Sequence, residues 1–77
     1  MHILLAIIIH ILTISEINFE YQKHMMMNKQ LPNKWVSGFA ITGKEECHIF
    51  VPPITDEYTL DIYLHEVKHC YEGSWHK

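Results

Sequence analysis

Two histidines and a glutamate near the end of the sequence have the types and spacing of a metal-centred hydrolytic site. His65 and His69 lie four residues apart in HEVKH. On a helix both imidazoles would project from the same face on successive turns, where two ring nitrogens can reach one zinc ion at about 2.0–2.1 Å. Glu66 lies beside the first histidine, where its carboxylate could take a proton from a water that zinc has acidified. The stretch therefore predicts zinc binding by His65 and His69, with Glu66 as the catalytic general base.

A zinc site that keeps one position open to water needs a third protein ligand. His76 follows Gly73, a residue typical of helix ends, by three positions, so the chain can turn back there and present its ring. We expect His76 to be this ligand. His48 is the second choice and Cys47 the third, because both fall on an expected neighbouring strand.

The stretch HEVKHCYEGSWH resembles the zinc-binding segment of the zincin metallopeptidases, and most of all the metzincin pattern His-Glu-x-x-His-x-x-Gly-x-x-His. The resemblance implies that His65, His69 and His76 bind zinc, that Glu66 is the base and that Gly73 makes the turn. One residue more than in the metzincin pattern separates His69 from Gly73. We therefore expect a minimal, metzincin-like zincin.

Zincins also carry an edge strand beside the active helix that pairs with the substrate backbone, and segment 47–51 is similar in position. The function implied by the resemblance is zinc-dependent hydrolysis of peptide bonds in a peptide or protein substrate. Two alternatives stay open. One is a non-catalytic binding module in which zinc, held by four protein ligands, staples a small core; the other is an inactive fragment of a longer peptidase.

Length and charge restrict the other classes of function. The chain has 77 residues, room for one domain, and so small a domain buries only about 60% of the surface of its unfolded chain. Small folds of this kind usually need a disulfide, a metal or a partner chain. The formal net charge is −3 with only six Lys plus Arg, so no basic cluster is present to bind nucleic acid.

The first 15 residues are almost wholly apolar from position 3 to 14, with Thr13 and Ser15 as small residues before Glu16. A dozen apolar residues fit a signal-peptide core and fall short of the roughly 20 that a membrane-spanning helix needs. One interpretation is therefore a signal peptide or membrane tether (1–15) ahead of a zincin-like domain (16–77), in an exported protein. The other is a buried helix or strand, since periodicity cannot separate the two.

The state of the two cysteines also depends on whether the chain is exported. In an exported chain Cys47 and Cys70 would form a disulfide, which the chain-entropy model values at roughly 3 kcal/mol. In a reducing compartment they would be thiols or metal ligands.

The remaining pattern predicts an α+β fold, in which a short β-hairpin packs on the zinc-binding helix and a second helix precedes them. We expect the second helix over 16–30, with Phe19 and one or two of its three consecutive methionines inward. The hairpin is expected from two β-rich segments, 35–43 and 46–53, joined at Gly43-Lys44. In its second strand Ile49 and Val51 would share one face, and His48 and Phe50 the other.

The zinc-binding helix is expected from position 57 to a stop at Gly73, with Thr55 as its N-cap and acidic residues in its first turn. Its apolar positions recur at i, i+4, i+7 and i+11, which predicts one stripe facing the core and the histidines on the opposite, polar face. The stripe consists of Leu60, Leu64, Val67 and Tyr71.

Overall fold

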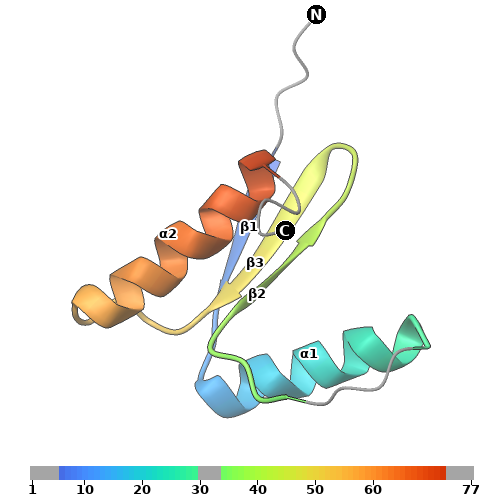
Figure 1. Ribbon diagram of the computed structural model, residues 1–77, viewed down its shortest axis with the longest axis horizontal. Helices are drawn as coiled ribbons and strands as arrows, with labels where there is room; N and C mark the ends of the chain where they lie inside the picture. Colours follow the sequence, from blue (N-terminus) through green and yellow to red (C-terminus); the bar gives the residue numbers. More distant parts are fainter. Residues whose placement is uncertain (1–5, 30–33, 73–77) are drawn as a thin grey trace, which may run out of the picture.

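A three-stranded mixed sheet with two helices makes up the protein, in a computed structural model that describes residues 6–29 and 34–72. The elements in chain order are β1 (Ala6–Ile11), α1 (Ile14–Met27), β2 (Phe39–Thr42), β3 (Glu46–Val51) and α2 (Glu57–Glu72). β3 is the central strand, parallel to β1 and antiparallel to β2. Figure 1 shows α2 lying diagonally across the sheet and α1 at the end of the sheet where β1 stops. The expected α+β class and the hairpin are confirmed.

The apolar N-terminal segment supplies a strand. Ile7 pairs with Cys47 and Ile11 with Val51, so residues 6–11 run along the whole length of β3 as an edge strand. The segment is thus a strand, as one interpretation expected, but none of residues 6–11 is buried. No helix within the described ranges is long and apolar enough to cross a membrane. Cleavage before Glu16 stays a prediction; it would remove β1 together with Thr13.

α1 begins earlier than expected because Thr13 caps it. The Thr13 hydroxyl accepts a hydrogen bond from the Glu16 backbone N–H, and the Glu16 carboxylate accepts one from the Thr13 N–H. These two bonds satisfy donors that a helix start leaves free. Phe19 was expected inward and is 65% exposed, with the Lys23 ammonium over its ring. The inward face of α1 is made instead by Ile14, Ile17, Asn18, Tyr21 and Met25.

α2 has the expected length, but Asp56 rather than Thr55 caps its start. The Asp56 carboxylate accepts the Thr59 backbone N–H, and the Thr59 hydroxyl accepts the Asp56 N–H. These hydrogen bonds lower the pKa of the exposed Asp56 carboxyl.

The predicted apolar stripe of α2 is largely wrong. Leu60, Leu64 and Tyr71 are 40%, 52% and 73% exposed, and of the four stripe residues only Val67 packs against the buried core. The face turned to the sheet is offset around the helix axis and consists of Ile62, Tyr63, Glu66, Val67 and Cys70.

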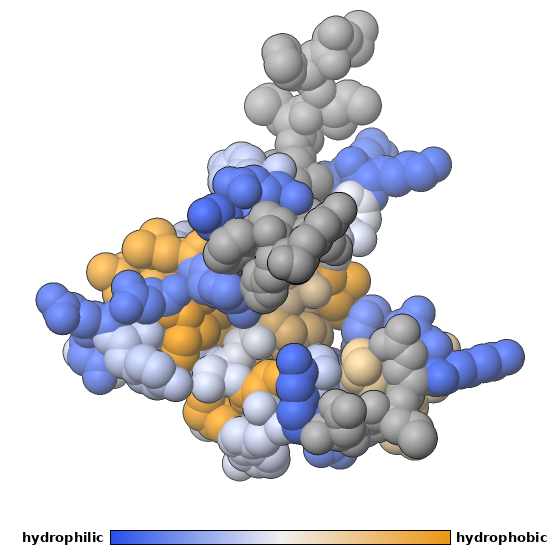
Figure 2. Space-filling view, in the orientation of Figure 1, coloured by the Kyte–Doolittle hydropathy of each residue, from blue (hydrophilic) through white to orange (hydrophobic). Residues whose placement is uncertain are grey.

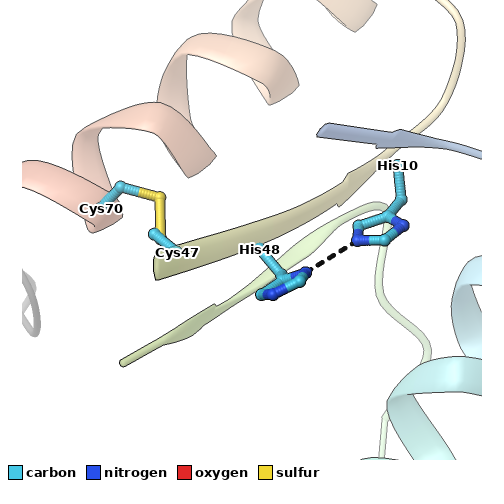
Figure 3. The surroundings of a disulfide bond; sticks show 4 residues. All are labelled: His10, Cys47, His48 and Cys70. Atoms are coloured by element: carbon cyan, nitrogen blue, oxygen red, sulfur yellow. Dashed lines mark hydrogen bonds between the residues drawn. A yellow bond between two sulfur atoms is a disulfide. The ribbon is translucent and has the colours of Figure 1, made fainter. Parts of the chain in front are cut away.

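The sheet separates two small cores, as the alternation of side chains in β3 requires. Cys47, Ile49 and Val51 pack with α2, whereas Phe50 packs with Phe39, Ile17 and other side chains of the α1 side. The expected faces of β3 are thus confirmed. A disulfide between Cys47 and Cys70, with Cα atoms 5.7 Å apart, ties β3 to α2 and confirms the pairing expected from the sequence (Figure 3).

Candidate metal-binding and catalytic site

His65 and His69 lie on successive turns of α2, and their Nε2 atoms are 3.2 Å apart. Their ring planes are inclined by 77°, so the two nitrogens approach from different directions. Two nitrogen ligands of a tetrahedral zinc, each at about 2.0–2.1 Å, are separated by about 3.3–3.4 Å. The two rings therefore already stand close to the separation that one zinc ion requires.

Glu66 is the main departure from the expected site. Only 6% of it is exposed, and it lies on the sheet-facing side of α2 rather than on a solvated polar face. Burial raises the pKa of its carboxyl, and the nearby His69 opposes that rise. The side chain lines two cavities, and the His69 imidazole is its electrostatic neighbour. A carboxyl with a shifted pKa in a cavity is a candidate for a functional group.

Two cavities meet at this glutamate. One, of about 330 Å³, is lined by His65, Glu66 and His69 together with residues of β2. The other, of about 470 Å³, is lined by His65, Glu66, Trp35 and Tyr58 on the side of the α2 N-terminus. His65 and Glu66 line both cavities and so lie between them, whereas His69 lines the first cavity only.

Close approach of α2 to the sheet depends on Gly38, just before β2. A Cβ atom here would lie 2.9 Å from Ile62 Cγ2 and 3.0 Å from the Phe50 carbonyl oxygen. Glu66 Cγ would be 3.5 Å away. Glycine at this position therefore lets the helix bring Glu66 against the edge of the sheet.

The strand beside the site is β2, not segment 47–51 as expected. Segment 47–51 lies in β3, the central strand, whereas β2 is at an edge of the sheet and contributes Phe39, Ala40 and Thr42 to the cavity wall. The sequence prediction misplaced the edge strand because it did not include β1, whose pairing puts β3 in the middle.

A buried asparagine holds the segment that leads into β2. Asn18, 1% exposed, donates to the Val36 carbonyl oxygen at 2.8 Å and accepts from the Val36 N–H at 2.8 Å. It also donates to the Ile14 carbonyl oxygen at 2.9 Å. A lone polar residue among the apolar positions of α1 was the sequence feature that could have revealed this anchor.

The second and third choices for the remaining zinc ligand do not reach the site. Cys47 is bonded to Cys70, so its sulfur is not available to a metal. His48 points to the opposite face of the sheet, where its Nδ1 lies 2.9 Å from His10 Nε2 and its Nε2 lies 3.3 Å from a Glu46 carboxylate oxygen (Figure 3). It is 38 residues from His10 in sequence, and the parallel pairing of β1 with β3 brings them together.

The expected third ligand, His76, and the turn residue, Gly73, lie outside the described residues. Among residues 6–29 and 34–72, no group of three or more His, Cys, Asp or Glu side chains is arranged to hold a metal. The described part of the chain thus provides two of the expected ligands and the expected base.

No protein-family model, curated protein or solved structure matches the chain.

Proposed function

We propose that the protein is a zinc-dependent peptidase in which His65 and His69, with His76 as the third ligand, bind the metal. The observation that carries the proposal is the pair of Nε2 atoms 3.2 Å apart beside a buried carboxylate in a groove. Imidazole nitrogens are ligands that suit zinc. When bound, zinc would acidify a water molecule and polarise the scissile carbonyl.

Glu66 would supply the proton transfers. Its carboxylate takes a proton from the attacking water and then gives it to the leaving amine, as a general base and then a general acid. Its burial supports this role because a carboxyl with a raised pKa holds a proton more readily than an exposed one.

β2 would hold the substrate in an extended conformation. In the hairpin the Gly43 N–H donates to the Glu46 carbonyl oxygen at 2.8 Å, and paired residues of an antiparallel ladder alternate between bonded and unbonded positions. By this alternation Phe39 and Ile41 bond to β3, and Ala40 and Thr42 direct their backbone groups to the open edge. Both line the cavity with His65 and Glu66. A peptide added to this edge would pass in front of the histidines.

The alternative, a zinc-stapled binding module, is less well supported. The disulfide already links α2 to the central strand, so the small fold has a staple without a metal. A structural zinc would also give no reason for a carboxylate on the sheet-facing side of α2, next to the two rings and lining a cavity. A glutamate on the solvated face of the helix would serve such a module equally well.

Replacement of Glu66 by Gln separates the two functions. We expect Glu66→Gln to fold and to bind zinc as the parent does, because the amide has nearly the same shape. Hydrolysis of a mixed peptide library should fall by at least about 100-fold, the lower range for loss of a general base. Cleavage is measured by mass spectrometry of the products. Equal cleavage by the parent and the variant would contradict the peptidase proposal. Zinc binding without cleavage by the parent would favour the module.

A further inference from the structure

The outer edge of β1 is a row of backbone groups that no described residue pairs with. In a parallel ladder alternate residues direct both their N–H and their C=O to the neighbouring strand. The Ala6 N–H donates to the Glu45 carbonyl oxygen and the Leu12 N–H to that of Val51, both at 3.0 Å. Even-numbered residues of β1 therefore bond to β3, and odd-numbered ones face outward. The outward residues are Ile7, Ile9 and Ile11.

No side chain of β1 itself protects this edge against pairing with another strand. β1 has the sequence AIIIHI, with no Lys, Pro, Asp or Glu, although natural edge strands commonly use such residues to avoid association. Two copies could approach here without repulsion between charges of the strand itself. The side chains of Ile9 and Ile11 are 43% and 59% exposed and lie on the face of the sheet that α2 covers in part.

The exposed flank of α2 extends the same apolar surface. His65 and His69 mark the flank of the helix that faces β2, and helical periodicity places Leu60, Leu64 and Tyr71 on the other flank, toward β1. All three are exposed, and hydrophobic surface is visible along α2 on the left of Figure 2. An open strand edge and an exposed apolar flank thus adjoin each other.

The geometry points to a second copy of this chain as the occupant of the β1 edge, in a symmetric dimer. A two-fold axis through Ile9 would pair Ile9 with its own copy, and Ile7 with Ile11 of the other chain. Each pairing joins two residues whose backbone groups face outward, so every outward N–H and C=O of the strand finds a partner. The edge is thus complementary to itself, as a two-fold interface requires.

The dimer would have a continuous six-stranded sheet. β1 of each chain would lie in its middle and β2 at each outer edge, so both candidate active-site grooves would stay open. The dimer requires neither zinc nor peptidase activity.

The first test is the mass of the purified chain in solution as a function of concentration. We expect twice the 9.2 kDa of one chain by light scattering or sedimentation. In Ile9→Lys two ammonium groups would face each other across the axis, and the dissociation constant should rise at least about tenfold. Met27→Lys is the control, because Met27 is 78% exposed on α1, far from the edge, and should leave the dimer unchanged. Circular dichroism checks that both variants fold.

The second test fixes the register by cross-linking. Directly bonded residues of an antiparallel pair have Cα atoms about 5.5 Å apart, within disulfide range. Ile9→Cys should therefore give an oxidised dimer, since the native cysteines are bonded to each other. Ile8→Cys would be offset from its own copy by two residues, about 7–8 Å, and should cross-link poorly. A monomer at all concentrations would overturn the proposal. Binding of that monomer to phospholipid vesicles would show that the apolar edge faces a membrane instead of a second copy. Open-ended aggregates, or equal cross-linking of both variants, would overturn it too.

Discussion

At the scale of single residues, Glu66 and Asn18 show how polar groups are placed inside a small core. Asn18 makes two donor bonds and one acceptor bond to backbone groups, whereas Glu66 lines two cavities beside His69. A buried group that is fully hydrogen-bonded specifies the fold, and a carboxyl with a shifted pKa in a cavity is a candidate for chemistry.

Asn18→Ala should cost about 1–3 kcal/mol in the free energy of unfolding, because it leaves the Val36 N–H and C=O without their side-chain partner. Asn28→Ala is the matched control. Asn28 is the exposed C-cap of α1, and its side chain bonds to His24 of the same helix. Urea unfolding should show a clearly smaller loss for the control. Equal losses would mean that Asn18 does not anchor the segment leading into β2.

The sequence predicts the His-Glu-x-x-His motif on a helix, but it does not predict that Glu66 is buried. His65, Glu66 and His69 stand as expected on one helix, and the buried side of that helix was misjudged. Apolar residues occur on nearly every side of α2, so periodicity alone did not settle which side packs. The disulfide could have settled it. Cys47 shares the face of Ile49 and Val51, so its partner Cys70 had to face the sheet.

At the scale of elements, the sheet order decides which strand can bind substrate. The sequence predicted the hairpin and its faces but left the N-terminal segment open between an export signal and a core element. A run of apolar residues is compatible with both, and in the structure residues 6–11 form a strand that pairs with β3 over six residues. That pairing makes β2 the edge strand beside the histidines.

Ala40→Pro tests substrate pairing at this edge. Proline removes the Ala40 N–H, which faces away from β3, so the ladder of the hairpin is retained. Loss of one backbone hydrogen bond to the substrate should lower kcat/KM by about 3- to 10-fold. Zinc content and melting temperature, measured on the same preparation, should match the parent. An unchanged kcat/KM would show that the peptide does not pair with β2 at this residue.

At the scale of the whole molecule, the disulfide compensates for a small core. The eight buried hydrophobic residues of the described chain form two separate clusters, one on each side of the sheet. The cross-link joins positions 23 apart in sequence and holds α2 against the face that carries Glu66. A disulfide favours an oxidising compartment, and export of the chain stays a prediction.

Replacement of both cysteines by alanine should lower the free energy of unfolding by about 3 kcal/mol, the value expected for a closed loop of this length. Chemical denaturation of the double variant, and of the parent with a thiol reductant, should give the same direction of change. A midpoint equal to that of the oxidised parent would contradict a stabilising role for the cross-link.

The most direct test of the whole account is the zinc content of the purified chain, by mass spectrometry of the metal after dialysis. We expect one zinc per chain in the parent, and loss or strong weakening of zinc binding in His69→Ala and in His76→Ala. His48→Ala, which removes a histidine from the opposite face of the sheet, should keep the metal. No zinc in the parent, or the same zinc content in His69→Ala as in His48→Ala, would contradict the proposed site and the hydrolysis built on it.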